Sequence, residues 1–99
     1  MNDKENILIK LTVIIPVFNE EKTVIKILNG LKYLKNLCNL EIIVINDGSK
    51  DNTKKVINEN LKLLTKTINF ENNRGKGKAV IEGLKYANGD YVIIQDADL

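Results

Sequence analysis

Tyr91-Val92-Ile93-Ile94-Gln95-Asp96-Ala97-Asp98 is the stretch of this 99-residue chain that decides its fold. The first four residues are apolar and rich in β-branched side chains, which favours a β-strand. The two aspartates then lie at the carboxyl end of that strand, the edge where ligands bind in open α/β sheets. Carboxylate pairs hold Mg²⁺ or Mn²⁺ against a substrate phosphate. The stretch therefore predicts a strand followed by a candidate metal site at Asp96 and Asp98.

Three further runs of strand length precede it, and helical patterns separate the four. Two of the runs are nearly continuous in Val and Ile, which is typical of parallel strands covered on both faces. Apolar residues recur at helical spacing between the strands. Alternating strands and helices predict an α/β fold, a Rossmann-like β-α-β-α-β-α-β parallel sheet with right-handed crossovers. The expected strands are 11–17, 41–46, 65–70 and 91–95, and the expected helices cover 24–34, 56–64 and 79–87.

The connections also carry signals. Asn19 is expected to cap the first helix, because a short polar side chain can accept a hydrogen bond from the first helical turn. The segment Asn88–Asp90 is expected to end the third helix as a C-cap, since glycine and asparagine tolerate left-handed backbone. Gly83 lies inside that helix with Ala79 and Ala87 on the same stripe. We interpret this stripe as a packing surface that lets the helix lie close to the sheet.

Acidic residues follow three of the predicted strands. Because parallel strands end at one edge, Phe18–Glu20, Asp47–Ser49 and Asp96–Asp98 are expected to converge there, with strands one and four flanking a switch point. Carboxylates gathered in this way repel one another unless a cation or a hydrogen-bonding ligand compensates. A metal-bound nucleotide would meet that need, with the cation at the Asp pair and a base or ribose at Asp47. Each acid taken singly is better explained as a solvated turn residue, and it is their coincidence at three strand ends that favours a functional site.

The basic loop Arg74–Lys78 precedes the third helix and has two interpretations. Its glycines permit close backbone approach, the helix N-terminus favours an anion, and Arg74 and Lys76 could neutralise a diphosphate. Alternatively, the glycines make a turn and the lysines are solvated. The loop matches neither a Walker phosphate loop nor a dinucleotide-binding fingerprint after the first strand, which argues against an ATPase and a dehydrogenase.

Composition sets the remaining limits. Ninety-nine residues indicate one domain, and a net charge of +2 with scattered lysines argues against a nucleic-acid partner or an anionic membrane surface. A single cysteine, Cys38, excludes an internal disulfide and fits a reducing compartment. No run is long enough to span a membrane, and the polar start does not look like a signal peptide. We expect a cytoplasmic protein, with residues 1–10 as a polar lead-in and 11–99 as the domain.

Taken together, these segments resemble the nucleotide-sugar-binding half of family 2 glycosyltransferases with the GT-A fold. The ending Asp-Ala-Asp-Leu and the Arg-Gly-Lys-Gly loop are most similar to the dolichyl- or polyprenyl-phosphate sugar synthase branch. The resemblance covers nearly the whole chain, and the order and register of its parts make it specific. Those parts are Val13–Glu21, Ile43–Thr53, Asn73–Ala79, Ala87–Asp90 and Asp96–Leu99.

The resemblance implies a role for each site residue. It implies a nucleotide pocket lined by Pro16, Phe18 and Glu20. It also implies that Asp47 binds the base and that Gly48 contacts the nucleotide. Further roles fall to the later residues: Lys76 near the diphosphate, Asp96 facing the ribose, the sugar or the metal, and Asp98 as the chief protein ligand of Mg²⁺ or Mn²⁺.

The reaction implied by the resemblance is inverting transfer of a sugar from a UDP- or GDP-linked donor. The implied acceptor is a glycan or a lipid phosphate such as a polyprenyl phosphate. In the family, the acceptor site and catalytic base follow the Asp-x-Asp motif, so the 99-residue chain is expected to be a donor-binding half, inactive by itself. The full-length protein would act at the cytoplasmic face of a membrane. An exposed sheet edge would permit self-association. The alternative is a non-catalytic nucleotide-binding or structural α/β module.

Overall fold

A four-stranded parallel sheet forms the centre of the protein. The computed structural model describes residues 9–98, and every strand pairing within them is parallel. The strand order is β3-β2-β1-β4, so the chain first steps outward from β1 and then crosses back to its other side. The predicted switch point between the first and fourth strands is confirmed. The strands are β1 (Lys10–Val17), β2 (Asn39–Asp47), β3 (Lys66–Phe70) and β4 (Tyr91–Ile94).

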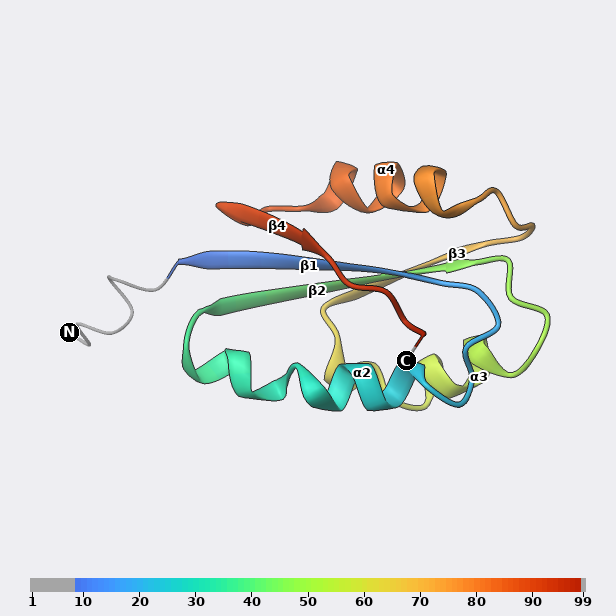
Figure 1. Ribbon diagram of the computed structural model, residues 1–99, viewed down its shortest axis with the longest axis horizontal. Coiled ribbons are helices and arrows are strands. Elements are labelled where there is room, and N and C mark those ends of the chain that lie inside the picture. The colour runs from blue at the N-terminus through green and yellow to red at the C-terminus, as the bar shows by residue number, and fades with distance from the viewer. Residues whose placement is uncertain (1–8, 99) are drawn as a thin grey trace.

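Helices cover both faces of this sheet, as Figure 1 shows. Each of the first two predicted helices is in fact a short α-helix followed by a 3₁₀ turn, and both lie on one face, whereas the third lies alone on the other. The predicted α/β doubly wound arrangement is therefore confirmed. The helical elements are α2 (Val24–Gly30), η1 (Lys32–Asn36), α3 (Thr53–Asn58), η2 (Leu61–Leu63) and α4 (Lys76–Tyr86).

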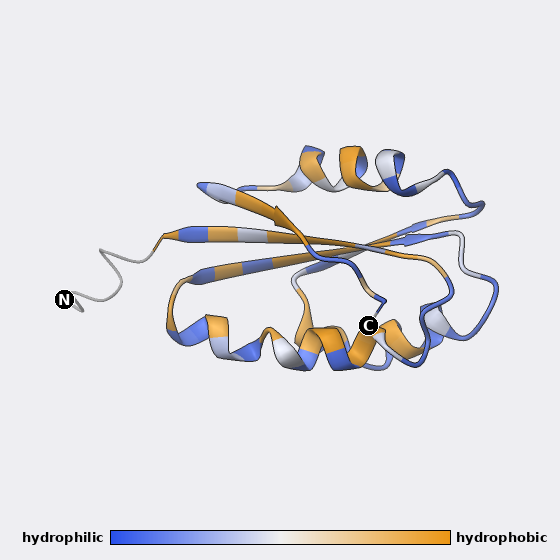
Figure 2. Cartoon of the chain, in the orientation of Figure 1, coloured by the Kyte–Doolittle hydropathy of each residue, from blue (hydrophilic) through white to orange (hydrophobic). Residues whose placement is uncertain are grey.

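The core is divided by the sheet into two clusters, because successive side chains of a strand point to opposite faces. In β1, Val13 and Ile15 pack toward α2 and α3, whereas Ile14 packs toward α4 with Ile43 of β2. All four side chains are at most 1% exposed. Figure 2 shows apolar residues gathered along the strands, with hydrophilic residues in the loops beyond their ends. This two-sided burial explains the continuous apolar runs in the sequence.

Gly83 confirms the packing interpretation of the small-residue stripe on α4. A Cβ atom at this position would lie 2.8 Å from methyl groups of Ile14 and Ile45, both fully buried. The absence of a side chain lets α4 approach β1 and β2 directly.

Two expected caps are wrong. Asn19 lies before the helix: α2 starts at Val24, Thr23 precedes it, and Asn19 has left-handed backbone with φ of 52°. The segment after α4 has no left-handed residue, and Ala87 is already extended. Gly89 is needed there for space instead, because a Cβ would lie 2.6 Å from the Thr12 backbone nitrogen.

Two other expectations concern the start of the chain and membrane-spanning segments. Most of the predicted lead-in, residues 1–10, lies outside the described residues, although Lys10 already belongs to β1. Among the helices of residues 9–98, none has the length and apolar character needed to cross a bilayer.

Candidate functional site

A pocket of about 410 Å³ opens at the carboxyl edge of the sheet. Its walls come from the ends of β1, β2 and β4 and from the N-terminus of α4. This is the edge at which open α/β sheets bind ligands. The lining residues are Pro16, Val17, Phe18, Glu20, Asp47, Asn73, Gly75, Lys76, Asp96, Ala97 and Asp98.

The pocket brings together seven of the eight residues to which the resemblance gives a role, with Gly48 the exception. Arg74, the other candidate for a diphosphate contact, does not line the pocket, and its guanidinium lies over the Phe70 ring. Gly48 is buried beneath the loop that follows β3, where a Cβ would lie 2.3 Å from the backbone of Asn72 and Asn73. Its φ of 70° also favours glycine. The structure therefore gives Gly48 a steric role in seating that loop. The ligand-binding roles of the other seven remain predictions.

Asp47 is held by the same loop. It is 3% exposed, and its Oδ1 accepts the Arg74 N–H at 2.7 Å. Its Oδ2 accepts the Gly75 N–H at 3.0 Å and the Asn73 side-chain amide at 3.1 Å. Hydrogen bonds to an ionised acceptor are stronger than neutral ones. Asp47 thus fixes the conformation of Asn73–Gly75 directly before α4, besides lining the pocket.

The loop after β1 is attached to the loop after β2. The Asn19 N–H donates to Ser49 Oγ at 2.9 Å, and the Asn19 side-chain oxygen accepts the Lys50 N–H at 2.8 Å. Asparagine tolerates the left-handed backbone that this arrangement requires. The Glu20 N–H donates to Thr53 Oγ1 at 3.0 Å. These bonds hold Phe18 and Glu20 at the pocket wall, and they explain what Asn19 does in place of capping α2.

Asp51 anchors the start of α3 within the same group of loops. Its Oδ1 accepts the Thr53 N–H at 2.9 Å and the Thr53 hydroxyl at 2.5 Å. Burial by itself raises the pKa of Asp51, but the hydrogen bonds from Thr53 and from the Glu21 N–H outweigh it, so the pKa lies below its ordinary value. Asp51 is therefore an ionised structural residue beside the pocket.

Thr23 connects this region with the Asp-Ala-Asp segment. Its hydroxyl oxygen lies 2.7 Å from the carbonyl oxygen of Ala97 and 2.8 Å from a carboxylate oxygen of Glu20. The single hydroxyl proton serves one of these acceptors at a time. Ala97 is itself 3% exposed and belongs to the core cluster under α2. Burying Ala97 turns the two flanking aspartates outward, and both are exposed in the pocket.

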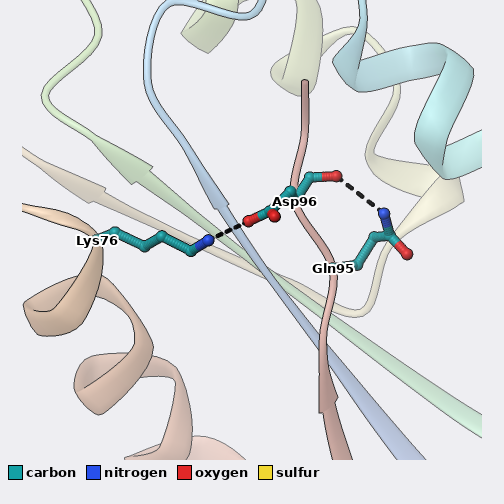
Figure 3. A network of polar contacts seen from close by, with 3 residues as sticks. All are labelled: Lys76, Gln95 and Asp96. Carbon is teal, nitrogen blue, oxygen red and sulfur yellow. Dashed lines mark hydrogen bonds and ion pairs between the residues drawn. The ribbon is translucent and has the colours of Figure 1, made fainter. Parts of the chain in front are cut away.

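Lys76 and Asp96 form an ion pair across the pocket (Figure 3). Lys76 comes from the first turn of α4, and Asp96 follows β4. The side chains are 60% and 56% exposed, so water screens the pair and its contribution to stability is small. Gln95 turns back to donate its amide to the Asp96 carbonyl oxygen at 3.0 Å. The pair places a positive charge against a carboxylate that the sequence predicts to face a cation.

The chemistry of the pocket fits a divalent cation shared with a phosphate. Among residues 9–98, no three His, Cys, Asp or Glu side chains form a closed metal site. Asp96 and Asp98 nevertheless both line the pocket, and the Lys76 ammonium already lies against Asp96. Mg²⁺ typically takes one or two carboxylates and completes its shell with water and substrate phosphates. An open pair of aspartates satisfies that requirement.

Sequence reasoning missed three lining residues, Val17, Asn73 and Ala97, whereas Gly75 belongs to the basic loop that it named. Asn73 is the most informative, because its amide donates to both the carbonyl and the carboxylate of Asp47. Only its position in a polar turn before the glycines marked it, and that signal does not say what an asparagine contacts.

The comparisons with known proteins agree with this geometry. The family described as "Glycosyl transferase family 2" matches residues 12–99. The chain is 38% identical to the bactoprenol glucosyl transferase of Shigella phage SfV, covering 91% of this chain and 31% of that protein. It is 37% identical to the dolichyl-phosphate beta-glucosyltransferase ALG5A of Trichomonas vaginalis, covering 89% of this chain and 30% of the relative.

A solved structure gives the same result for the fold. The mannosyltransferase PcManGT from Pyrobaculum calidifontis, in complex with GDP-Man and Mn²⁺, superimposes with a TM-score of 0.80 at 29% identity. The match covers 92% of this chain and 28% of that one. The chain thus spans about a third of the length of the proteins that it matches. With the fold, the pocket and the sequence match in agreement, the chain belongs to glycosyl transferase family 2.

Proposed function

We propose that residues 11–99 form the donor-binding part of an inverting glycosyltransferase, which holds a nucleoside diphosphate sugar and a divalent metal in the carboxyl-edge pocket. One observation carries the proposal: seven residues predicted from sequence line a single pocket in a family 2 chain. A solved structure of similar fold is a complex with GDP-Man and Mn²⁺, which supports a nucleotide-linked donor.

The proposed roles follow the walls of the pocket. Pro16 and Phe18 supply an apolar surface for the nucleoside, and Phe18 is 42% exposed before any ligand covers it. Asp47 lies near the base, where its remaining lone pairs can accept a hydrogen bond. Glu20 completes this side of the pocket. The nucleoside thus rests against side chains that the loop hydrogen bonds already hold in position.

The diphosphate would lie between Lys76 and the aspartate pair. Asp98 and Asp96 would hold Mg²⁺ or Mn²⁺, which when bound supplies Lewis-acid stabilisation of the departing diphosphate. Lys76 would exchange its partner Asp96 for a phosphate oxygen. In the inverting reaction, an acceptor oxygen forms a bond to the anomeric carbon from one face as the bond to the diphosphate breaks on the other.

The acceptor, in this proposal, is a polyprenyl phosphate or a glycan. Relatives named as bactoprenol and dolichyl-phosphate glucosyltransferases support the lipid-linked alternative. A lipid-linked acceptor would place the full-length protein in the cytoplasm, at the cytoplasmic face of a membrane. We propose that the 99-residue chain binds donor without transferring sugar, because it spans about a third of its relatives. Sugar transfer by this chain would contradict that statement.

Calorimetric titration with UDP, GDP and their sugars, with and without Mn²⁺, tests the proposal. We expect Mn²⁺-dependent binding that Asp98→Ala abolishes and that Glu59→Gln leaves unchanged, since Glu59 is exposed and lies outside the pocket. Absence of binding under every condition would instead support the alternative, a non-catalytic or structural α/β module. Binding that survives Asp98→Ala would show that the metal site lies elsewhere.

A further inference from the structure

The lysines of this chain are scattered in sequence but segregated in space. The segments 24–37 and 53–64 build the helical layer of α2, η1, α3 and η2, and they contain a single acidic residue, Glu59. Glu20, Glu21 and Asp51 lie just before the two segments. The helices α2 and α3 lie on the same side of the sheet in Figure 1. The layer carries six lysines, all exposed: Lys26, Lys32, Lys35, Lys54, Lys55 and Lys62.

Helical geometry directs two of these lysines away from the sheet. Lys26 is two residues from both Val24 and Leu28, which are fully buried against the sheet. At about 100° per residue, a two-residue step points to the opposite side of the helix. Lys55 has the same relation to Thr53 and Ile57, which are at most 1% exposed. The outer surfaces of α2 and α3, which pack beside each other, therefore both present ammonium groups to solvent.

No lysine of this layer belongs to an ion pair within the described part of the chain. Both ion pairs among residues 9–98 involve α4, on the other side of the sheet. There, Lys76 pairs with Asp96 and Lys85 with Glu82. The net charge of +2 therefore hides an uneven distribution, because the layer of α2, η1, α3 and η2 carries six lysines and one acidic residue.

Large apolar side chains project from the same layer. Tyr33 and Leu37 follow α2 and are 62% and 65% exposed, and Leu61 of η2 is 51% exposed. Leu61 lines one hollow together with Lys32, Lys62 and Glu59. Lysines interspersed with exposed apolar residues are typical of surfaces that lie on an anionic bilayer, where ammonium groups meet lipid phosphates and apolar tips enter the interface.

We propose that the layer of α2, η1, α3 and η2 docks on a bilayer containing anionic phospholipid. Nucleic acid would satisfy the lysines but would give Leu37 and Leu61 no apolar environment. The layer also lacks arginine, since the single arginine, Arg74, lies in the loop before α4. The docking would bring the proposed donor pocket to the surface that holds a lipid-linked acceptor, and in this respect it rests on the proposed function. The two can fail separately, because vesicle binding needs no donor.

Co-sedimentation with vesicles tests the proposal, comparing phosphatidylcholine alone with phosphatidylcholine plus phosphatidylglycerol. We expect binding only to the anionic vesicles, weakening as salt screens the charges. Each basic residue near such a surface contributes about fivefold in partitioning. Reversing two charges with Lys26→Glu and Lys55→Glu should therefore lower the partition coefficient by at least ~25-fold. The same charge change on the other side, Lys78→Glu with Lys85→Glu, should lower it far less.

Apolar variants and a competitor complete the test. Leu37→Ser with Leu61→Ser should weaken binding to anionic vesicles by roughly tenfold or more, because the exposed part of each leucine would be buried in the bilayer interface. Far-ultraviolet circular dichroism checks that each variant is folded. The proposal is overturned by no binding to anionic vesicles, by equal losses in the α2/α3 and α4 charge variants, or by tighter binding to duplex RNA than to vesicles.

Discussion

At the scale of single residues, two buried carboxylates of this protein, those of Asp47 and Glu41, hold the backbone of loops in place by accepting hydrogen bonds from their N–H groups. Asp47 accepts three hydrogen bonds from Asn73–Gly75, and Glu41 accepts others at the opposite end of the sheet. Each carboxylate lies on β2 and holds a loop that flanks α4. The two ends of this helix are therefore fixed by charge-assisted hydrogen bonds to the central strands. Substituting either residue should loosen a defined loop.

Asp47→Asn should loosen the loop before α4. Asparagine keeps one carbonyl oxygen but presents an amide to N–H groups, so at least one of the Arg74 and Gly75 amides loses its acceptor. We expect about 2 kcal/mol of destabilisation in urea unfolding and faster hydrogen exchange of these two amides. Asp96→Asn is the control, because its side chain is exposed and should change stability by less than about 0.5 kcal/mol. Unchanged exchange at Arg74 and Gly75 would contradict the role given to Asp47.

Glu41 should make the free energy of unfolding depend on pH in the acid range. It is 8% exposed and accepts the Thr12 hydroxyl at 2.7 Å and the Asn88 N–H at 2.8 Å. Burial by itself raises the pKa of Glu41. The hydrogen bonds from Asn88 and Thr12 and the charge of Lys10 outweigh burial, so the pKa lies below the ordinary value of 4.5.

A carboxyl group whose pKa is lowered by folding stabilises the folded state. This stabilisation is complete above the pKa of the unfolded state and is lost as pH falls through the pKa of the folded state. Glu41→Gln should therefore be less stable than the wild type near neutral pH, and the difference should shrink on acidification below about pH 4.5. Urea unfolding from pH 7 to pH 3 measures this. The pKa of Asp51 is also lowered, so the free energy of unfolding of the Glu41→Gln variant should still depend in part on pH. A constant difference at every pH would contradict this account.

At the scale of elements, α4 depends on a helix glycine for its position. Alanine normally stabilises a helix by about 1 kcal/mol relative to glycine. Gly83→Ala should nevertheless destabilise the protein by about 1–3 kcal/mol, because the new methyl would overlap Ile14 and Ile45. Gly77→Ala on the same helix is the matched control, with nothing within 4 Å of its Cβ, and it should be neutral or stabilising. Thermal unfolding compares the two, and stabilisation by Gly83→Ala would show that α4 can move away from the sheet.

The elements were predictable from sequence where one local rule dominates. Continuous Val and Ile runs predicted β1, β2 and β4, a weaker run at 65–70 predicted β3, and the alternation with helices predicted that the strands are parallel. The helix ends were less predictable, because they depend on partners distant in sequence. Asn19 bonds to Ser49 and Lys50 rather than capping α2, and Gly89 is required by contact with Thr12. No local pattern in the chain contains those pairings.

The candidate site shows the same division. The acids after the strands were predicted to converge because parallel strands end at one edge, and the pocket contains them. The second function of Asp47, as an acceptor for Asn73–Gly75, depends on the closeness of the loops after β2 and β3. The segregation of lysines was likewise hidden, since a net charge carries no information about which face of a sheet a helix covers.

At the scale of the whole molecule, the two edges of the sheet differ. The β3 edge presents Lys66 and Asn69, polar side chains of the kind that protect edge strands. The β4 edge presents four consecutive apolar residues, each between 37% and 63% exposed: Tyr91, Val92, Ile93 and Ile94. By pairing with β1, Val92 and Ile94 face the same side as Thr12 and Ile14, and the other two face the opposite side. Both faces of this edge are therefore apolar.

The open β4 edge should make the isolated 99-residue chain self-associate. Unpaired backbone groups flanked by apolar side chains are a template for another strand, and a second copy supplies a matching one. We expect the apparent mass in analytical ultracentrifugation to rise with protein concentration, and Ile93→Lys, which places a charge on that edge, to restore the monomer. Asn69→Lys places the same charge at an exposed position of the β3 edge and should leave association unchanged. A monomeric wild type at all concentrations, or equal effects of the two lysines, would show that copies do not meet through β4.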